Sequence, residues 1–188
     1  MLTLTQIERA AENAAKVAYS VLGLDCKYDV DIISDPSIPE DGLLDTQTNT
    51  IILNLTKLKP FSSDEAGAKD VRTEEDRLLD ENFRHLMKIS YVVFHEMRHL
   101  YQKRVVEEYT INKKLGGRLV PQPESDKKCE LWLAEMKNPA PNQDIEEDAN
   151  DFAYYLSNRY PIELPMLRTS RRLGVMKRKY NKVGIPKD

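Results

Sequence analysis

Apolar residues recur at helical spacing in three stretches of the chain, which predicts three amphipathic helices. The first follows a capping-box pattern at Thr5 and Glu8 and ends at Gly23. The second covers residues 73 to about 113 and forms a long helical region. The third covers residues 144–159 and is followed by prolines, which cannot continue a helix.

Between the first two predicted helices, the pattern changes to one that is typical of strands. Apolar and charged residues alternate over residues 27–32, which predicts a strand with one buried face. Residues 43–44 and 50–54 flank a polar turn, as in a hairpin. These elements together predict an α+β fold, in which a small, mostly antiparallel sheet packs on the second and third helices.

In the remaining segments, the apolar residues show neither helical nor strand periodicity. Residues 114–141 are rich in Gly, Pro and charged residues, with Leu131–Leu133 as their only compact apolar cluster. We interpret this segment as an ordered excursion or lid and assign no secondary structure to it. The chain has 188 residues, a length that fits one globular domain. We place this domain at residues 1–165, followed by a tail at residues 166–188.

The net charge of −3 is unevenly distributed along the chain. The tail, residues 166–188, contains eight basic residues and one acidic residue, so it carries +7 and leaves −10 on residues 1–165. The body is therefore expected to repel nucleic acid. The basic tail is expected to attract an anionic partner.

The sequence favours a cytoplasmic location with no membrane partner. The longest apolar run near the middle of the chain, Tyr91–Phe94, is far shorter than the roughly 20 residues that span a bilayer. The charged N-terminal region is unlike a secretory signal. Cys26 and Cys129 belong to no paired redox or metal motif, which favours reduced thiols.

An HExxH motif lies within the second predicted helix. Residues four apart lie on one helix face, with Cβ atoms about 6 Å apart, so His95 and His99 can bind one metal ion. Glu96 can then reach a water molecule that the metal activates. The alternative is a pair of partly exposed histidines without a metal. His85 lies on the order of 15 Å away along the helix and cannot share the site.

A catalytic zinc ion has three protein ligands, so a further ligand is required. The third predicted helix begins with Glu146, Glu147 and Asp148. Carboxylates are also common at helix starts because they favour the positive end of the helix dipole, and this explanation needs no metal. The small residues Ala149 and Ala153 favour a ligand, because they allow a close approach to the HExxH helix.

The motifs at residues 95–99 (HEMRH) and 146–153 (EEDANDFA) resemble those of the gluzincin metallopeptidases. Among these, they are similar to the ImmA/IrrE-type peptidases of bacteria and their mobile elements, in which HExxH is followed by E-x-E-A-N-x-F-A. The resemblance implies a zincin-like fold and a zinc ion held by His95, His99 and Glu146. It also implies that the substrate is a transcriptional repressor.

Helix geometry independently favours Glu146 as the third ligand. The buried stripe of the third helix consists of Ile145, Ala149, Phe152 and Leu156. Glu147 points nearly opposite to this stripe, whereas Glu146 and Asp148 each lie roughly 80° from its centre. Glu146 is flanked by Asn150 and Ala153, which provide a hydrogen-bonding group for a ligand and room for a close approach of the helices. Asp148 is shorter and has bulkier neighbours.

The expected activity is zinc-dependent hydrolysis of peptide bonds, with Glu96 as the general base. Asn150 is expected to hydrogen-bond a ligand histidine. The strand at residues 50–54 is expected to bind an extended substrate along its edge. Candidates for stabilising the oxyanion are Tyr154, Tyr155 and Tyr160, although packing is the commoner role of such residues.

An alternative function is that of a non-catalytic zinc-binding protein, which contacts nucleic acid or an acidic partner through its basic tail. The tail favours this alternative. Glu96 argues against it, because a purely structural zinc site does not need a base beside a ligand.

Overall fold

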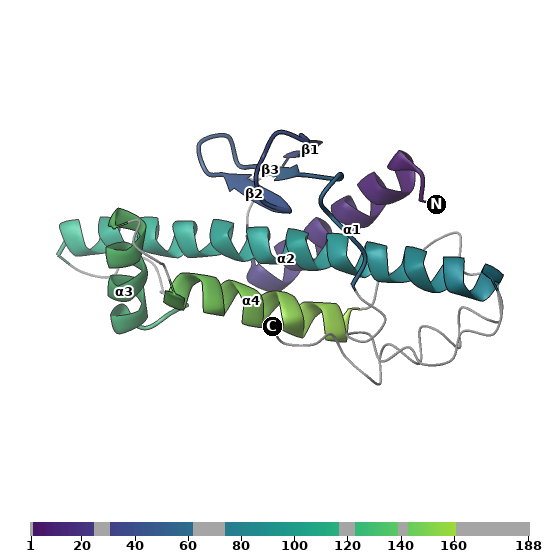
Figure 1. The fold of residues 1–188 in the computed structure, drawn as a ribbon. Coiled ribbons are helices and arrows are strands. Elements are labelled where there is room, and N and C mark those ends of the chain that lie inside the picture. The colour runs from purple at the N-terminus through teal and green to yellow at the C-terminus, as the bar shows by residue number, and fades with distance from the viewer. Residues whose placement is uncertain (1, 25–30, 62–73, 117–122, 139–142, 161–188) are drawn as a thin grey trace.

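The computed structural model describes residues 2–24, 31–61, 74–116, 123–138 and 143–160. Within these ranges the chain forms four helices and a small three-stranded sheet (Figure 1), and the α+β class is as expected. The elements in chain order are α1 (Leu4–Leu22), β1 (Asp31–Ser34), β2 (Gly42–Asp45), β3 (Thr50–Leu53), α2 (Glu74–Lys114), α3 (Asp126–Lys137) and α4 (Gln143–Arg159).

Helix α1 begins two residues earlier than the expected capping box. The N-cap is Thr3, whose hydroxyl accepts a hydrogen bond from the Gln6 N–H, while the Gln6 side chain accepts one from the Thr3 N–H. The prediction of Thr5 and Glu8 is therefore wrong, because a glutamine three residues after a threonine serves equally well in a capping box. The predicted end is confirmed: Gly23 adopts the left-handed conformation, with φ 60°, which glycine tolerates best.

The sheet is mixed, whereas a mostly antiparallel sheet was expected. Strands β2 and β3 form the predicted antiparallel hairpin, but β1 pairs in parallel with β3, and the strand order is β1-β3-β2. The first part of the expected strand, residues 27–30, lies outside the described residues. Strand β3 is central, so it has no open edge among the described residues and the expected edge binding at residues 50–54 is wrong.

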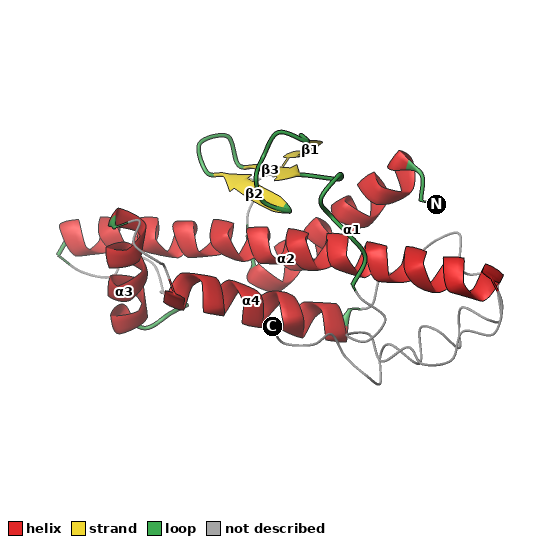
Figure 2. Cartoon of the chain, viewed as in Figure 1, coloured by secondary structure: helices red, strands yellow, loops and turns green. Residues whose placement is uncertain are grey.

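Helix α2 is the central element of the fold (Figure 2), and α1, β2, α3 and α4 all pack against it. It is one continuous helix of 41 residues. Helix α4 runs antiparallel to it, with Gln102 contacting Ile145 and Tyr91 contacting Asn150. Strand β2 approaches α2 closely at Gly42.

The segment at residues 114–141 contains a helix that the sequence pattern does not specify. Helix α3 starts at the N-cap Ser125, whose hydroxyl accepts from the Lys128 N–H. Its Trp132 is buried, and the ring lies 5.7 Å from the Arg98 guanidinium on α2. No helix among the described residues is long and apolar enough to cross a membrane. The basic tail, residues 166–188, lies outside them.

Candidate metal centre

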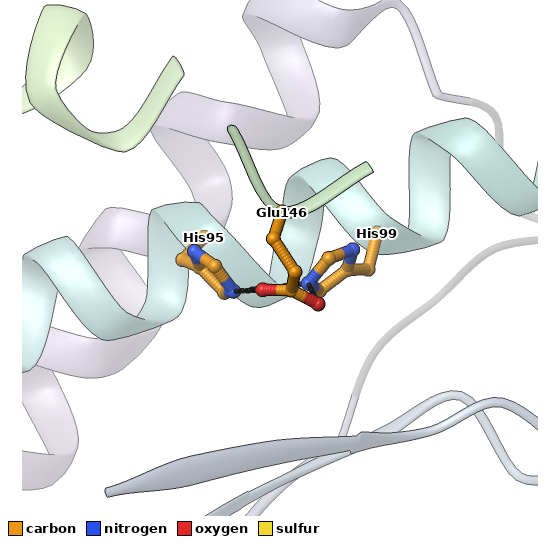
Figure 3. Close-up of side chains that lie close together, drawn as sticks. All are labelled: His95, His99 and Glu146. Atoms are coloured by element: carbon orange, nitrogen blue, oxygen red, sulfur yellow. Dashed lines mark hydrogen bonds and ion pairs between the residues drawn. The ribbon is translucent and has the colours of Figure 1, made fainter. Parts of the chain in front are cut away.

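Three side chains from two helices point toward one another at the middle of α2 (Figure 3). His95 and His99 lie one turn apart on α2, and their Nε2 atoms are 2.9 Å apart. Glu146, in the first turn of α4, places its two carboxylate oxygens 3.2 Å from His95 Nε2 and 3.4 Å from His99 Nε2. The structure thus brings together the three residues expected to be ligands, and His85 is not among them.

This donor set fits a zinc ion. Zinc–nitrogen bonds of roughly 2.0–2.1 Å place two ligands of a tetrahedral ion roughly 3.3 Å apart. The two Nε2 atoms are 2.9 Å apart, and they lie 3.2 and 3.4 Å from different oxygens of Glu146, so the group is compact enough to surround one ion. Two imidazole nitrogens and one carboxylate also form a ligand set known in catalytic zinc sites, which leaves one position for substrate or water.

The charges of these groups favour a cation between them. Hydrogen bonds with both histidines hold the pKa of Glu146 far below its usual range. Burial lowers the pKa of His99, but the hydrogen bonds with Glu146 and Gln102 and the negative charges of Glu96 and Glu146 together outweigh burial, and the net shift is upward. A carboxylate that stays ionised beside two imidazoles attracts a positive charge, either a proton or a metal ion.

Glu96 lies beside the cluster and is only 7% exposed. Burial raises the pKa of its carboxyl, while the nearby histidines and a hydrogen bond from the Leu44 N–H of β2 act in the opposite direction. It shares with the cluster a cavity of about 590 Å³. The cavity is lined by Glu40, Gly42, Leu43, Leu44, Thr46, His95, Glu96, His99, Gln102, Lys103, Met136, Ile145 and Glu146.

Asn150 contacts the first histidine, as expected from the sequence. Its Oδ1 lies 3.0 Å from His95 Nδ1 and also accepts a hydrogen bond of 3.0 Å from the Tyr91 hydroxyl. Tyr91 precedes His95 by one helical turn and lies on the same face of α2. These contacts orient the His95 ring so that its Nε2 faces Glu146.

The second histidine has a partner that the sequence pattern does not single out. His99 Nδ1 lies 2.8 Å from Oε1 of Gln102, which is fully buried. The Gln102 amide nitrogen donates to the Ile145 carbonyl at 3.0 Å and to the Asp148 carboxylate at 2.9 Å. The only signal in the sequence is the spacing of three residues, which places Gln102 on the same helix face as His99.

Asp148 belongs to an ion network and lies outside the ligand cluster. Arg98 donates to both of its oxygens, at 2.6 and 3.1 Å, and Lys128 of α3 donates to Oδ1 at 2.9 Å. Burial raises the pKa of Asp148, but hydrogen bonds from Arg98, Lys128 and Gln102 lower it to about 2. The carboxylate is thus fully engaged in joining α2, α3 and α4.

The three tyrosines considered for oxyanion stabilisation do not line the cavity. Tyr154 packs beside Phe83 and Met87, and the Tyr155 hydroxyl accepts from Arg159. Tyr160 is exposed at the end of α4. The strand beside the cluster is β2, which lies at the edge of the described sheet.

Comparisons of the chain with protein-family models, with curated proteins and with solved structures found no match.

Proposed function

We propose that this protein is a zinc-dependent metallopeptidase with a zincin-like catalytic centre. The observation that carries the proposal is the convergence of His95, His99 and Glu146, with the buried Glu96 next to the first histidine in one cavity. The two histidines alone would also suit an exposed helix face. The third donor, Glu146, comes from another helix, and Glu96 is an acid that a purely structural zinc site does not need. Together they favour a catalytic site over a structural one.

Bound zinc would supply Lewis-acid activation of a water molecule and of the scissile carbonyl. Glu96 takes the proton of the attacking water on its carboxylate and transfers it to the leaving amine. Burial suits Glu96 to the first step, because it raises the pKa of the carboxyl and so makes the carboxylate a better proton acceptor. Asn150 and Gln102 hold the two histidine rings in position during the reaction.

The cavity also supports a peptide as the substrate. Strand β2 contributes Gly42, Leu43 and Leu44 to the lining, and its outer edge is unpaired within the described sheet. An extended peptide can pair with such an edge through main-chain hydrogen bonds. The resemblance to ImmA/IrrE-type peptidases suggests a transcriptional repressor, or another protein of a bacterial mobile element, as the natural substrate.

The test combines metal analysis with the variant Glu96→Gln. Protein purified without chelator should contain about one zinc per chain, measured by elemental analysis. Glu96→Gln should keep the zinc and lose hydrolysis of a labelled protein substrate, because the substitution removes the base and no ligand. Absence of zinc after zinc is supplied would refute the proposal. If the wild type and Glu96→Gln both contain zinc and neither hydrolyses the substrate, the result would favour the alternative of a non-catalytic zinc-binding protein.

A further inference from the structure

Gln102 is a buried polar side chain in the middle of the interface between α2 and α4. It is fully buried, and its amide makes contacts with three groups. Hydrogen bonds of this number on a fully buried side chain define the orientation of an amide.

The two partners of the Gln102 nitrogen can only accept hydrogen bonds. They are the main-chain carbonyl of Ile145, at 3.0 Å, and the carboxylate of Asp148, at 2.9 Å. The NH₂ group must therefore face these two oxygens, and the opposite orientation would place oxygen against oxygen. The partners of Asn150 do not fix the orientation of its amide in this way, because one of them, the Tyr91 hydroxyl, can either donate or accept.

The orientation of the amide determines what the His99 ring presents to the ligand cluster. Oε1 of Gln102 lies 2.8 Å from His99 Nδ1 and can only accept, so Nδ1 carries the hydrogen. In the neutral ring, Nε2 then carries the lone pair, and this atom faces Glu146 and His95. The same amide holds the Ile145 carbonyl, which directly precedes the ligand Glu146 in the chain.

We propose that Gln102 is a positioning residue that holds His99 in the Nδ1–H form, with Nε2 available to a metal ion, and that fixes the first turn of α4 beside it. This inference rests on the proposed zinc site and adds a residue that acts through two of its ligands. Hydrogen bonds of this kind to the far nitrogen of a ligand histidine typically change metal affinity about 10- to 100-fold.

Two substitutions in the full-length chain separate positioning from a merely structural role. Gln102→Met keeps the size of the side chain and removes the acceptor for His99. Gln102→Glu keeps an acceptor for His99 but loses the donors to Ile145 and Asp148 and adds a buried negative charge, so it is expected to be the less stable variant. If Gln102 has a positioning role, Gln102→Glu should bind zinc more tightly than Gln102→Met although it is the less stable of the two variants.

Zinc affinity is measured by competition with a chromophoric chelator, and stability by thermal unfolding of the metal-free protein. Gln102→Met should bind zinc about 10- to 100-fold more weakly than the wild type. Gln102→Glu should have an affinity between these two, because it keeps the acceptor for His99 and loses the contact with Ile145. The control Val105→Ala shortens a fully buried side chain one turn away and should lower stability without changing zinc affinity. Unchanged affinity in Gln102→Met, or affinities that follow stability in all variants, would overturn the inference.

A spectroscopic readout covers the case in which Gln102→Glu does not fold. In the zinc-loaded wild type, the Nδ1 proton of His99 should give an exchange-protected resonance in the proton NMR spectrum, and this resonance should disappear in Gln102→Met. Its persistence would overturn the inference while leaving the zinc site intact. A wild-type protein that binds no zinc would instead refute the proposed function, and the inference with it.

Discussion

The close approach of β2 to α2 at Gly42 allows the effect of a substitution on stability to be predicted quantitatively. A Cβ atom at position 42 would lie 2.3 Å from Val92 Cγ1, whereas carbon atoms in ordinary contact are about 3.5–4.0 Å apart. Gly42→Ala therefore requires a displacement of roughly 1.2 Å or more between the strand and the helix. Val92 is short, branched and buried, so it cannot swing away, and the backbone must move.

Overpacking of this kind costs about 1–3 kcal/mol. Replacing glycine by alanine also restricts the unfolded chain, which offsets about 0.4–1 kcal/mol of that cost. We therefore expect Gly42→Ala to lower the free energy of unfolding by about 1–2 kcal/mol. Val92→Ala should lower it by roughly 1–3 kcal/mol through the cavity that it leaves.

A double variant tests whether the contact between positions 42 and 92 causes the loss of stability. In Gly42→Ala with Val92→Ala, the new methyl group occupies space that Val92 has vacated, so the double variant should be about 1–2 kcal/mol more stable than the sum of the single effects predicts. Urea denaturation of all four proteins measures this coupling, provided that the slope of the transition stays constant. Additive effects would show that the Gly42–Val92 contact does not limit the approach of β2, and would refute the reasoning.

Two further predictions concern the carboxylates of α4. Glu146→Gln should weaken zinc binding at least tenfold more than Asp148→Asn, because only Glu146 contacts the two histidines; the reverse ranking in a chelator titration would contradict the ligand assignment. Asp148→Asn should lower the free energy of unfolding by about 2 kcal/mol at pH 7, since the folded-state pKa of Asp148 is about 2 against an ordinary value of 3.8. This stabilisation is present above pH 3.8 and is lost as the pH falls toward 2, so urea denaturation should show the two proteins converging there; a difference that does not change with pH would point to another cause.

Helices α1, α2 and α4 and the hairpin were predictable because their signals are local. The apolar period of α2, the glycine that ends α1 and the polar turn between β2 and β3 all act within a few residues. The parallel pairing of β1 with β3 was not predictable. The direction in which β1 pairs depends on how β1 packs in the folded chain and not on the residues of β1 themselves. Helix α3 escaped prediction because its stability comes from Trp132 and Lys128, which contact α2 and α4.

The same distinction applies to the site. The HExxH spacing places His95 and His99 on one face. The helical angle excludes Glu147, and the flanking residues favour Glu146 over Asp148, so the cluster follows from local geometry. The role of Asp148 depends on Arg98, 50 residues earlier, and that of Gln102 depends on Ile145, 43 residues later. Contacts between distant segments leave no periodic pattern in a single sequence, so these residues became evident only in the folded chain.

The origin of the three proposed ligands in two helices also determines when the candidate site can form during synthesis. Both histidines are in α2, whereas Glu146 follows only in α4, after α3 and its connections have been made. A growing chain that has emerged from the ribosome as far as α3 therefore has two of the three donors. The complete donor set appears only after α4 has emerged and docked along α2, so the proposed metal ion could be held by all three donors only late in the maturation of this protein.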